Sequence, residues 1–135
     1  MTMTDPVADF LTRVRNALHA QRQDVRIPAS RLKRELARIL TEEGYINGYE
    51  EIAPSSGNPG GEIRLTLKYT GDRVPVISGL ERVSRPGRRT YVNHGHIPRI
   101  QGGMGTAIVS TSRGVMTGHE ARRRGVGGEV VARVW

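Results

Sequence analysis

The stretch Ala107-Ile108-Val109-Ser110-Thr111-Ser112-Arg113-Gly114 runs from an apolar segment through three hydroxyl residues into an Arg-Gly pair. This pattern predicts a strand over Thr106–Thr111 that ends at a turn. Hydroxyl side chains both donate and accept hydrogen bonds, and a turn exposes backbone N–H groups beside them. Such a cluster suits a ligand in which phosphates, sugar hydroxyls and base edges alternate. The alternative interpretation, which position alone favours, is a polar strand end that binds nothing.

The net charge of +8 lies entirely in the second half of the chain. Residues 1–72 contain ten Lys and Arg and ten Asp and Glu, whereas residues 73–135 contain eleven basic and three acidic residues. A half this basic attracts a polyanion, and nucleic acid is the commonest one. An acidic membrane surface is the competing partner, but the sequence has neither a cationic amphipathic helix nor a lipidation motif. The charge therefore predicts nucleic-acid binding and no membrane partner.

Composition and motif spacing exclude several other kinds of site. The chain has no Cys, which rules out disulfides, zinc–thiolate sites and thiol catalysis. The glycines of Gly102–Gly105 lack the dinucleotide fingerprint, and neither Ser110 nor Ser112 lies in a Gly-x-Ser-x-Gly elbow. His94 and His96 would need a third metal ligand. We therefore expect no enzyme, no metal and no cofactor. No apolar run reaches membrane-spanning length and no secretory pattern opens the chain, so we expect a cytoplasmic protein.

Apolar spacing and capping residues predict the order α-β-α-β-β in the first half. The expected elements are a helix that Asp5 caps and Pro6 begins, a strand at Val25–Ile27, a helix that Ser30 caps and Gly44 ends, and strands at Tyr45–Ile52 and Glu62–Tyr69.

The second half contains eleven of the 17 glycines and only short strand candidates. The expected elements are strands at Leu80–Val83, Thr90–Val92, Thr106–Thr111 and Glu129–Trp135, a type II turn at Ser84–Gly87, a single helical turn at Ile97–Ile100, and a brief helix at Ala121–Arg124 after a Thr117 cap. The sequence thus predicts an α+β fold of two small domains. Residues 1–72 form the α/β domain, and residues 73–135 form a mainly antiparallel β domain with a short helix.

Basic residues and one aromatic gather around Pro86-Gly87. Arg82, Arg85, Arg88 and Arg89 flank this turn, and Tyr91 follows at once. An aromatic ring beside Arg side chains can stack an unpaired base, while Arg88 and Arg89 can bind phosphates. A solvated hairpin tip followed by a half-buried tyrosine is the alternative.

Five segments together carry a resemblance to a known family: Asp5-Pro6-Val7-Ala8-Asp9, Glu43-Gly44-Tyr45-Ile46, Arg82-Val83-Ser84-Arg85-Pro86-Gly87, the run from Ile108 to Thr117, and Gly125-Val126-Gly127-Gly128-Glu129. Along its whole length the chain resembles the bacterial family of the eighth protein of the small ribosomal subunit. The resemblance implies a structural protein of the ribosome that binds the central domain of 16S ribosomal RNA and helps to assemble the platform. It also implies a position near the fifth and twelfth small-subunit proteins and, in some members, repression of the messenger RNA of its own operon.

The resemblance also implies which residues contact RNA. The main contacts map onto Ser110, Thr111, Ser112, Gly114, Tyr91, Gly128 and Glu129, and the N-terminal contacts map onto Thr4, Arg15, Asn16, Ser30 and Lys33. One departure from the family concerns the short helix, because Gly118 stands where the family commonly has Asp. We expect that change to weaken the start of the helix.

Overall fold

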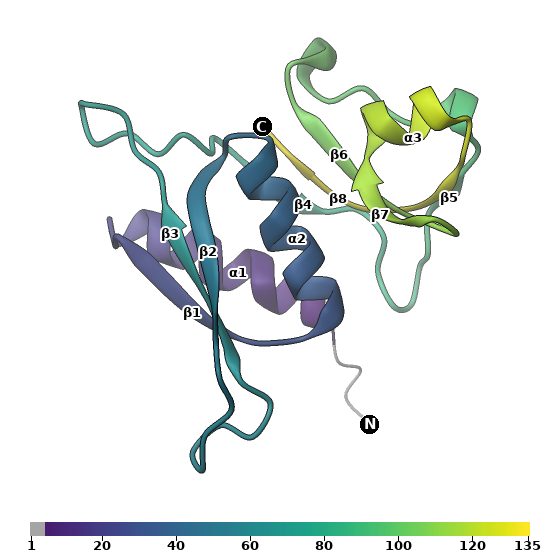
Figure 1. Cartoon of the computed structure of the whole chain (residues 1–135). Coiled ribbons are helices and arrows are strands. Elements are labelled where there is room, and N and C mark those ends of the chain that lie inside the picture. The colour runs from purple at the N-terminus through teal and green to yellow at the C-terminus, as the bar shows by residue number, and fades with distance from the viewer. Residues whose placement is uncertain (1–4) are drawn as a thin grey trace. The chain divides into compact units, whose positions relative to one another are not determined.

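In the computed structural model, residues 5–135 are described and form three α-helices and eight strands in two compact units (Figure 1). One unit is Asp9–Ile77, and the other combines residues 5–8 with Ser78–Trp135. The predicted α+β class is confirmed. The predicted domain division between residues 72 and 73 stays a prediction, because compactness does not show which segments fold independently.

The first unit has the predicted order of elements. They are α1 (Pro6–His19, of which all but the first three residues belong to this unit), β1 (Asp24–Pro28), α2 (Arg31–Glu42), β2 (Ile46–Ile52) and β3 (Glu62–Leu67). The three strands form an antiparallel sheet in the order β1-β3-β2. Figure 1 shows α2 running alongside β2, against which it packs.

Both α1 and α2 begin, and α2 ends, where local signals predict. The Asp5 carboxylate accepts a hydrogen bond from the Ala8 backbone N–H at 3.2 Å, and the Ser30 hydroxyl accepts one from the Lys33 N–H at 3.2 Å. Gly44 has a φ of +80°, so the chain can reverse there without steric cost. The Tyr45 N–H then reaches back to the Leu40 carbonyl at 2.9 Å and closes α2.

The core of the first unit is built from one stripe on each helix and one face of the sheet. Each large apolar side chain that is fully buried stabilises the fold by about 1.5–3 kcal/mol. On β3 the buried and less buried positions alternate, so the strand turns one apolar face to the core. The core residues shared by these elements are Phe10, Leu11, Val14, Leu18, Ile27, Leu36, Ile39, Leu40, Ile46, Ile63, Leu65 and Leu67.

The second unit is a five-stranded antiparallel sheet with one short helix. Its elements are β4 (Leu80–Arg82), β5 (Tyr91–Val92), β6 (Thr106–Thr111), β7 (Gly114–Thr117), α3 (Gly118–Arg124) and β8 (Gly128–Val134). The order is β4-β8-β6-β7, and β5 also pairs with β8. The last strand is therefore the central one. Figure 1 shows α3 beside β6 and β7, and its Ala121 joins a buried cluster with Val109 and Met116.

Two features of the loop before β5 differ from the prediction. The turn between Leu80–Val83 and Thr90–Val92 predicts that the second strand returns along the first, but β4 and β5 both pair with β8 instead. The turn is Arg85–Arg88, in which the two end residues exchange backbone hydrogen bonds of 3.0 and 2.9 Å. The prediction of a type II turn is wrong, because that type requires a positive φ at the third residue, and Gly87, which is third in Arg85–Arg88, does not have one. Pro at the second position suits type I turns equally, so the Pro-Gly pair could not discriminate between them.

The helical turn expected at Ile97–Ile100 is also wrong. Ile97 and Ile100 are extended, with ψ near 125° and 128°, and short 3-10 turns lie on either side at His94–His96 and Gln101–Gly103. Pro98 explains the difference, since the residue before a proline is pushed out of the helical region. Both isoleucines are buried in the cluster under α3.

The short helix α3 starts three residues earlier than predicted. The Thr117 hydroxyl accepts a hydrogen bond from the Glu120 N–H at 3.1 Å, which confirms the expected cap. A Cβ on Gly118 would lie 2.8 Å from Cγ2 of Ile97 and 3.2 Å from Cβ of Ala107. Glycine at this position therefore lets α3 approach β6 closely. None of the helices formed by residues 5–135 is long and apolar enough to cross a membrane.

We predict that Asp5 stabilises the protein through two bonds at once. Its carboxylate caps α1 and also accepts hydrogen bonds from Arg82 Nε at 3.1 and 3.2 Å, and both side chains are largely buried. Asp5→Ala should lower the free energy of unfolding by at least about 1–2 kcal/mol in urea titrations, because the cap is lost and a buried guanidinium loses its carboxylate. Asp72→Ala, at an exposed turn, should change it little.

The pH dependence of this contribution follows from the pKa of Asp5. Burial raises that pKa, but hydrogen bonds from Arg82 and the Ala8 N–H outweigh it and leave the pKa below its usual value. The stabilisation is therefore complete above about pH 4, the value in the unfolded chain, and is lost as the pH falls through the lower folded value. The difference in unfolding free energy between wild type and Asp5→Asn should shrink below that pH, and a constant difference would contradict the ion pair.

Candidate nucleic-acid interface

Three predicted site residues from distant parts of the chain lie in one row across the second sheet. Tyr91 of β5 is paired with Glu129 of β8, and Glu129 is paired on its other side with Ser110 of β6. Directly paired residues on antiparallel strands point to the same face. The ring of Tyr91, which is 69% exposed, therefore shares a face with the Ser110 hydroxyl and the Glu129 carboxylate.

The three consecutive hydroxyl residues do not form one patch. Thr111 is paired with Gly114 and Gly128, one position along from Ser110, so its side chain points to the opposite face. Its hydroxyl accepts a hydrogen bond from the Arg113 N–H at 3.0 Å and donates one to the Gly114 carbonyl at 2.8 Å. Thr111 thus closes the β6–β7 turn, while Ser112 and Arg113 lie exposed at its tip.

Close backbone packing accounts for the glycine before Glu129. A Cβ on Gly128 would lie 2.1 Å from the carbonyl oxygen of Ser110, far inside any allowed contact. A Cβ on Gly127 would similarly lie 2.4 Å from the carbonyl oxygen of Val92. The two glycines therefore let β8 fit between β5 and β6, so that Tyr91 and Ser110 lie on either side of Glu129.

The basic residues of the loop before Tyr91 fall into two groups. Arg89 donates a hydrogen bond to Glu129 Oε2 at 2.9 Å, so its charge is neutralised by a neighbour and its pKa is raised by that bond. Arg85 and Arg88 are exposed at the turn and have no carboxylate partner among residues 5–135. Only the second pair offers free positive charge to a ligand.

The Glu129 carboxylate is charged despite its burial. Burial raises its pKa, but hydrogen bonds from Ser84 and Arg89 outweigh this and hold the pKa below its usual value. The side chain is 17% exposed. A negative group therefore sits in the middle of the row, shielded by its two partners.

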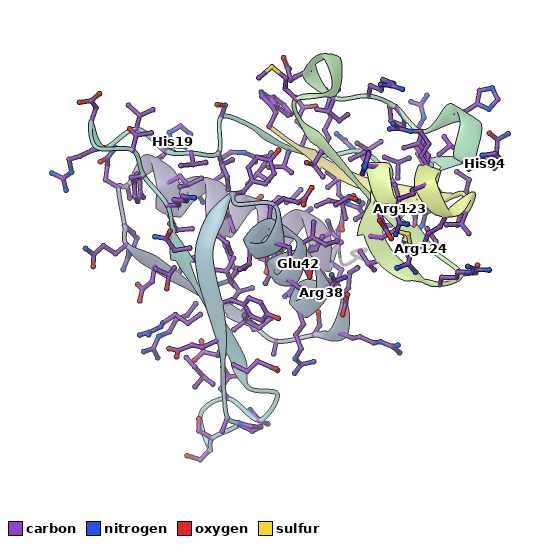
Figure 2. The ribbon with its side chains drawn as sticks, turned by 45° about the horizontal axis from the view of Figure 1, so that its top comes forward. His19, Arg38, Glu42, His94, Arg123 and Arg124 are labelled. Carbon is purple, nitrogen blue, oxygen red and sulfur yellow. The ribbon has the colours of Figure 1, made fainter. Side chains whose placement is uncertain are left out.

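The basic run of α3 is largely neutralised within the helix. Arg123 and Arg124, labelled in Figure 2, both pair with Glu120, at 2.5 and 2.6 Å. Their hydrogen bonds lower the pKa of Glu120 to about 2. These two cations stabilise the helix end and offer less charge to a partner than the sequence suggests.

The histidines do not gather into a metal site. His94 and His96 lie in one 3-10 turn, which the Asn93 side chain caps by accepting a hydrogen bond from the Gly95 N–H at 3.1 Å. Within the part of the chain that the structure describes, no three His, Asp or Glu side chains could hold a metal ion together.

The N-terminal candidates belong to the first unit, except Thr4, which lies outside the described residues. Arg15 and Asn16 are exposed on α1. Ser30 caps α2, so its hydroxyl already has one partner. Lys33 is only 7% exposed, and its Nζ lies 3.6 Å from a carboxylate oxygen of Asp9. The structure therefore gives Ser30 and Lys33 structural partners within their own unit.

Comparison with known proteins identifies the family. The model of the ribosomal protein S8 family matches residues 5–135.

The chain belongs to the ribosomal protein S8 family.

It is 54% identical to small ribosomal subunit protein uS8 of Moorella thermoacetica over 133 residues, which cover 98% of this chain and all of that protein. It is 53% identical to the uS8 proteins of Thermoanaerobacter sp. (strain X514) and Acidobacterium capsulatum over 135 residues, which cover both chains completely. The resemblance predicted from the sequence is confirmed.

In this S8 family member, two exposed cations were missing from the candidate residues predicted to bind RNA. Arg113 lies at the tip of the β6–β7 turn, and Arg85 begins the turn before β5. Arg113 directly follows Ser112, and Arg85 lies three residues before Arg88, so proximity in sequence to these two predicted contacts could have indicated both arginines. Their lack of ion-pair partners among the described residues was visible only in the structure.

We predict that Gly128→Ala disrupts the row. The new methyl group would meet backbone atoms of Ser110, which cannot rotate away, so β8 or β6 must shift. The free energy of unfolding should fall by about 1–3 kcal/mol, as for an overpacked core, in urea titrations followed by circular dichroism. Gly57→Ala is the control, because a Cβ there meets nothing within 4 Å. Equal effects of the two changes would contradict the close approach.

Proposed function

We propose that this chain is a structural component of the small ribosomal subunit and binds ribosomal RNA through its second unit. Membership of the S8 family supports the first part, since the full-length relatives are small-subunit ribosomal proteins. A protein of this family is a structural and not a catalytic component, and in bacteria it works in the cytoplasm.

The observation that carries the RNA-binding surface is the row of Tyr91, Glu129 and Ser110. An exposed tyrosine ring and a hydroxyl on the same sheet face fit single-stranded RNA, which offers an unpaired base for stacking and sugar hydroxyls for hydrogen bonding. Unpaired cations border this row at the two neighbouring turns, where they can meet phosphates on either side. They are Arg85, Arg88 and Arg113.

The finer identity of the partner is part of the same proposal. The family resemblance supports the central domain of 16S ribosomal RNA as the binding site, with the fifth and twelfth small-subunit proteins as neighbours. A messenger RNA from its own operon that presents the same shape would meet the same side chains, which supports translational repression as a second use. We assign RNA binding chiefly to residues 73–135, because the whole net charge lies there.

We predict that stacking on Tyr91 and hydrogen bonding by two serines carry RNA affinity. Tyr91→Ala should weaken binding of a 16S central-domain transcript by about 1–3 kcal/mol in filter binding, whereas Tyr91→Phe retains the ring and most of the affinity. Ser110→Ala combined with Ser112→Ala should also weaken binding, by roughly 1–3 kcal/mol for each desolvated bond lost. Thr111 is left unchanged because its hydroxyl closes the turn. Tyr49→Ala, in the first unit, is the control, and an equal loss there would refute the assignment.

We predict that the unpaired arginines set the salt dependence of binding. Arg88→Gln should reduce the slope of log affinity against log salt by about 0.7–0.9 for one lost phosphate contact. Arg13→Gln should change the slope less, because Arg13 is paired with Asp9 at 3.0 Å and lies in residues 1–72, which have no net charge. Filter binding between low and moderate salt measures both slopes. Identical changes would contradict the assignment of phosphate contacts to the second unit.

A further inference from the structure

Glu129 occupies a place where an acidic residue is unexpected. It lies between Tyr91 and Ser110 on the face proposed to meet a polyanion, where a free carboxylate would repel phosphates. Its carboxylate is instead engaged from within the protein. Oε2 accepts hydrogen bonds from the Ser84 hydroxyl and from Arg89 Nη1. Its role therefore has to be sought in what these bonds hold in place.

The bonds hold the two ends of one loop. Ser84 is completely buried, and besides donating to Glu129 its hydroxyl accepts a hydrogen bond from the Thr90 N–H at 3.1 Å. The backbone repeats this closure, since the Ser84 N–H donates to the Val130 carbonyl at 3.0 Å and the Val130 N–H donates to the Thr90 carbonyl at 2.9 Å. The segment between Ser84 and Thr90 is thus tied to β8 at both ends, beside Glu129.

The bond from Arg89 to Glu129 also decides which arginines of the loop keep a free charge. Arg89 forms an ion pair with Glu129, so these two residues contribute no net charge at the base of the loop. Arg85 and Arg88, which close the turn at the tip, keep their charges free. Tyr91 leaves the loop at its far end, directly opposite Glu129. Loosening the base of the loop would therefore disturb the tip cations and the ring together.

We propose that Ser84, Glu129 and Arg89 form a clamp that positions the 85–91 loop for one RNA shape, with Glu129 acting as a positioning residue through the loop. This rests on the proposed RNA-binding function. The clamp therefore favours the binding of one specific RNA over the binding of non-specific RNA. A fixed loop matches one arrangement of phosphates and an unpaired base, whereas non-specific RNA responds only to the number of free cations.

Two substitutions break the clamp with different effects on charge. Ser84→Ala removes the bonds to Thr90 and Glu129 but leaves Arg89 neutralised. Glu129→Gln loosens the loop and also frees Arg89. Both should weaken binding to a 16S central-domain transcript by about tenfold, the equivalent of one hydrogen bond to a charged group. Only Glu129→Gln should steepen the salt slope, by roughly one unit, and raise the affinity for poly(U).

Glu81→Gln is the matched control. Glu81 lies on β4 in the same unit and is paired with Arg133, so its replacement makes the same change of charge and also frees an arginine. It should leave the preference for the transcript over poly(U) unchanged. The double variant Ser84→Ala with Glu129→Gln should lose no more specific affinity than the worse single variant, because both act on one clamp.

Amide hydrogen exchange of the full-length free protein tests the clamp without RNA. The Arg88 N–H donates to the Arg85 carbonyl, a bond that neither substitution touches. Its exchange should accelerate by at least about tenfold in both clamp variants, which corresponds to a loss of about 1.4 kcal/mol of local stability. The amides of β6 and β7 should keep their protection and so report an intact fold.

The outcomes separate the clamp from the proposed function. If the Arg88 N–H exchanges at the wild-type rate in both variants, the clamp is refuted, whatever the affinities of the variants for RNA. Weak transcript binding by Glu129→Gln with wild-type binding by Ser84→Ala overturns it in favour of a direct contact between Glu129 and RNA. Loss of preference by Glu81→Gln equal to that of Glu129→Gln overturns it in favour of net charge. Failure of the wild-type protein to bind the transcript refutes the proposed function, while the exchange data still decide the clamp.

Discussion

The backbone hydrogen bonds of β8 are the interaction on which the second unit depends. This strand pairs with β4 and β5 along one edge and with β6 along the other, so among the strands of residues 5–135 it alone links β5 to β6. The fit is tight enough that Gly128 has no room for a side chain. Tyr91 and Ser110 lie in one row only because β8 pairs with both of their strands, and the loop before Tyr91 is anchored to the same strand through Val130.

Local signals in the sequence predicted the helices of the first unit well. A cap such as Ser30 and a reversal such as Gly44 act on backbone groups a few residues away, so the sequence alone contains both partners. The β half was harder, because its partners are distant. Pro98 could have argued against a helical turn at Ile97–Ile100, but the pairing of both β4 and β5 with β8 depends on residues 36 to 54 positions further along.

The sequence predicted which residues belong to the candidate site better than it predicted how they are arranged. Ser110, Thr111 and Ser112 are adjacent in sequence, yet strand alternation and a two-residue turn give each a different surrounding. Charge was similarly uneven, since a count of arginines cannot distinguish Arg88, which is unpaired among the described residues, from Arg89, which is held by Glu129. The bonds of Thr111 are local, within three residues, whereas Arg89 finds its carboxylate 40 positions further along, a pairing that composition and spacing do not encode.

The position of β8 has a consequence for the order in which the protein forms during synthesis. The strands of the first sheet all lie within residues 24–67, so that sheet can pair while later residues are still being added. The second sheet cannot, because its central strand, residues 128–134, is made after all its neighbours. Until then β4, β5 and β6 have unpaired edges, which are prone to mispairing. The surface proposed to recognise RNA can therefore be completed only after the first sheet has been made.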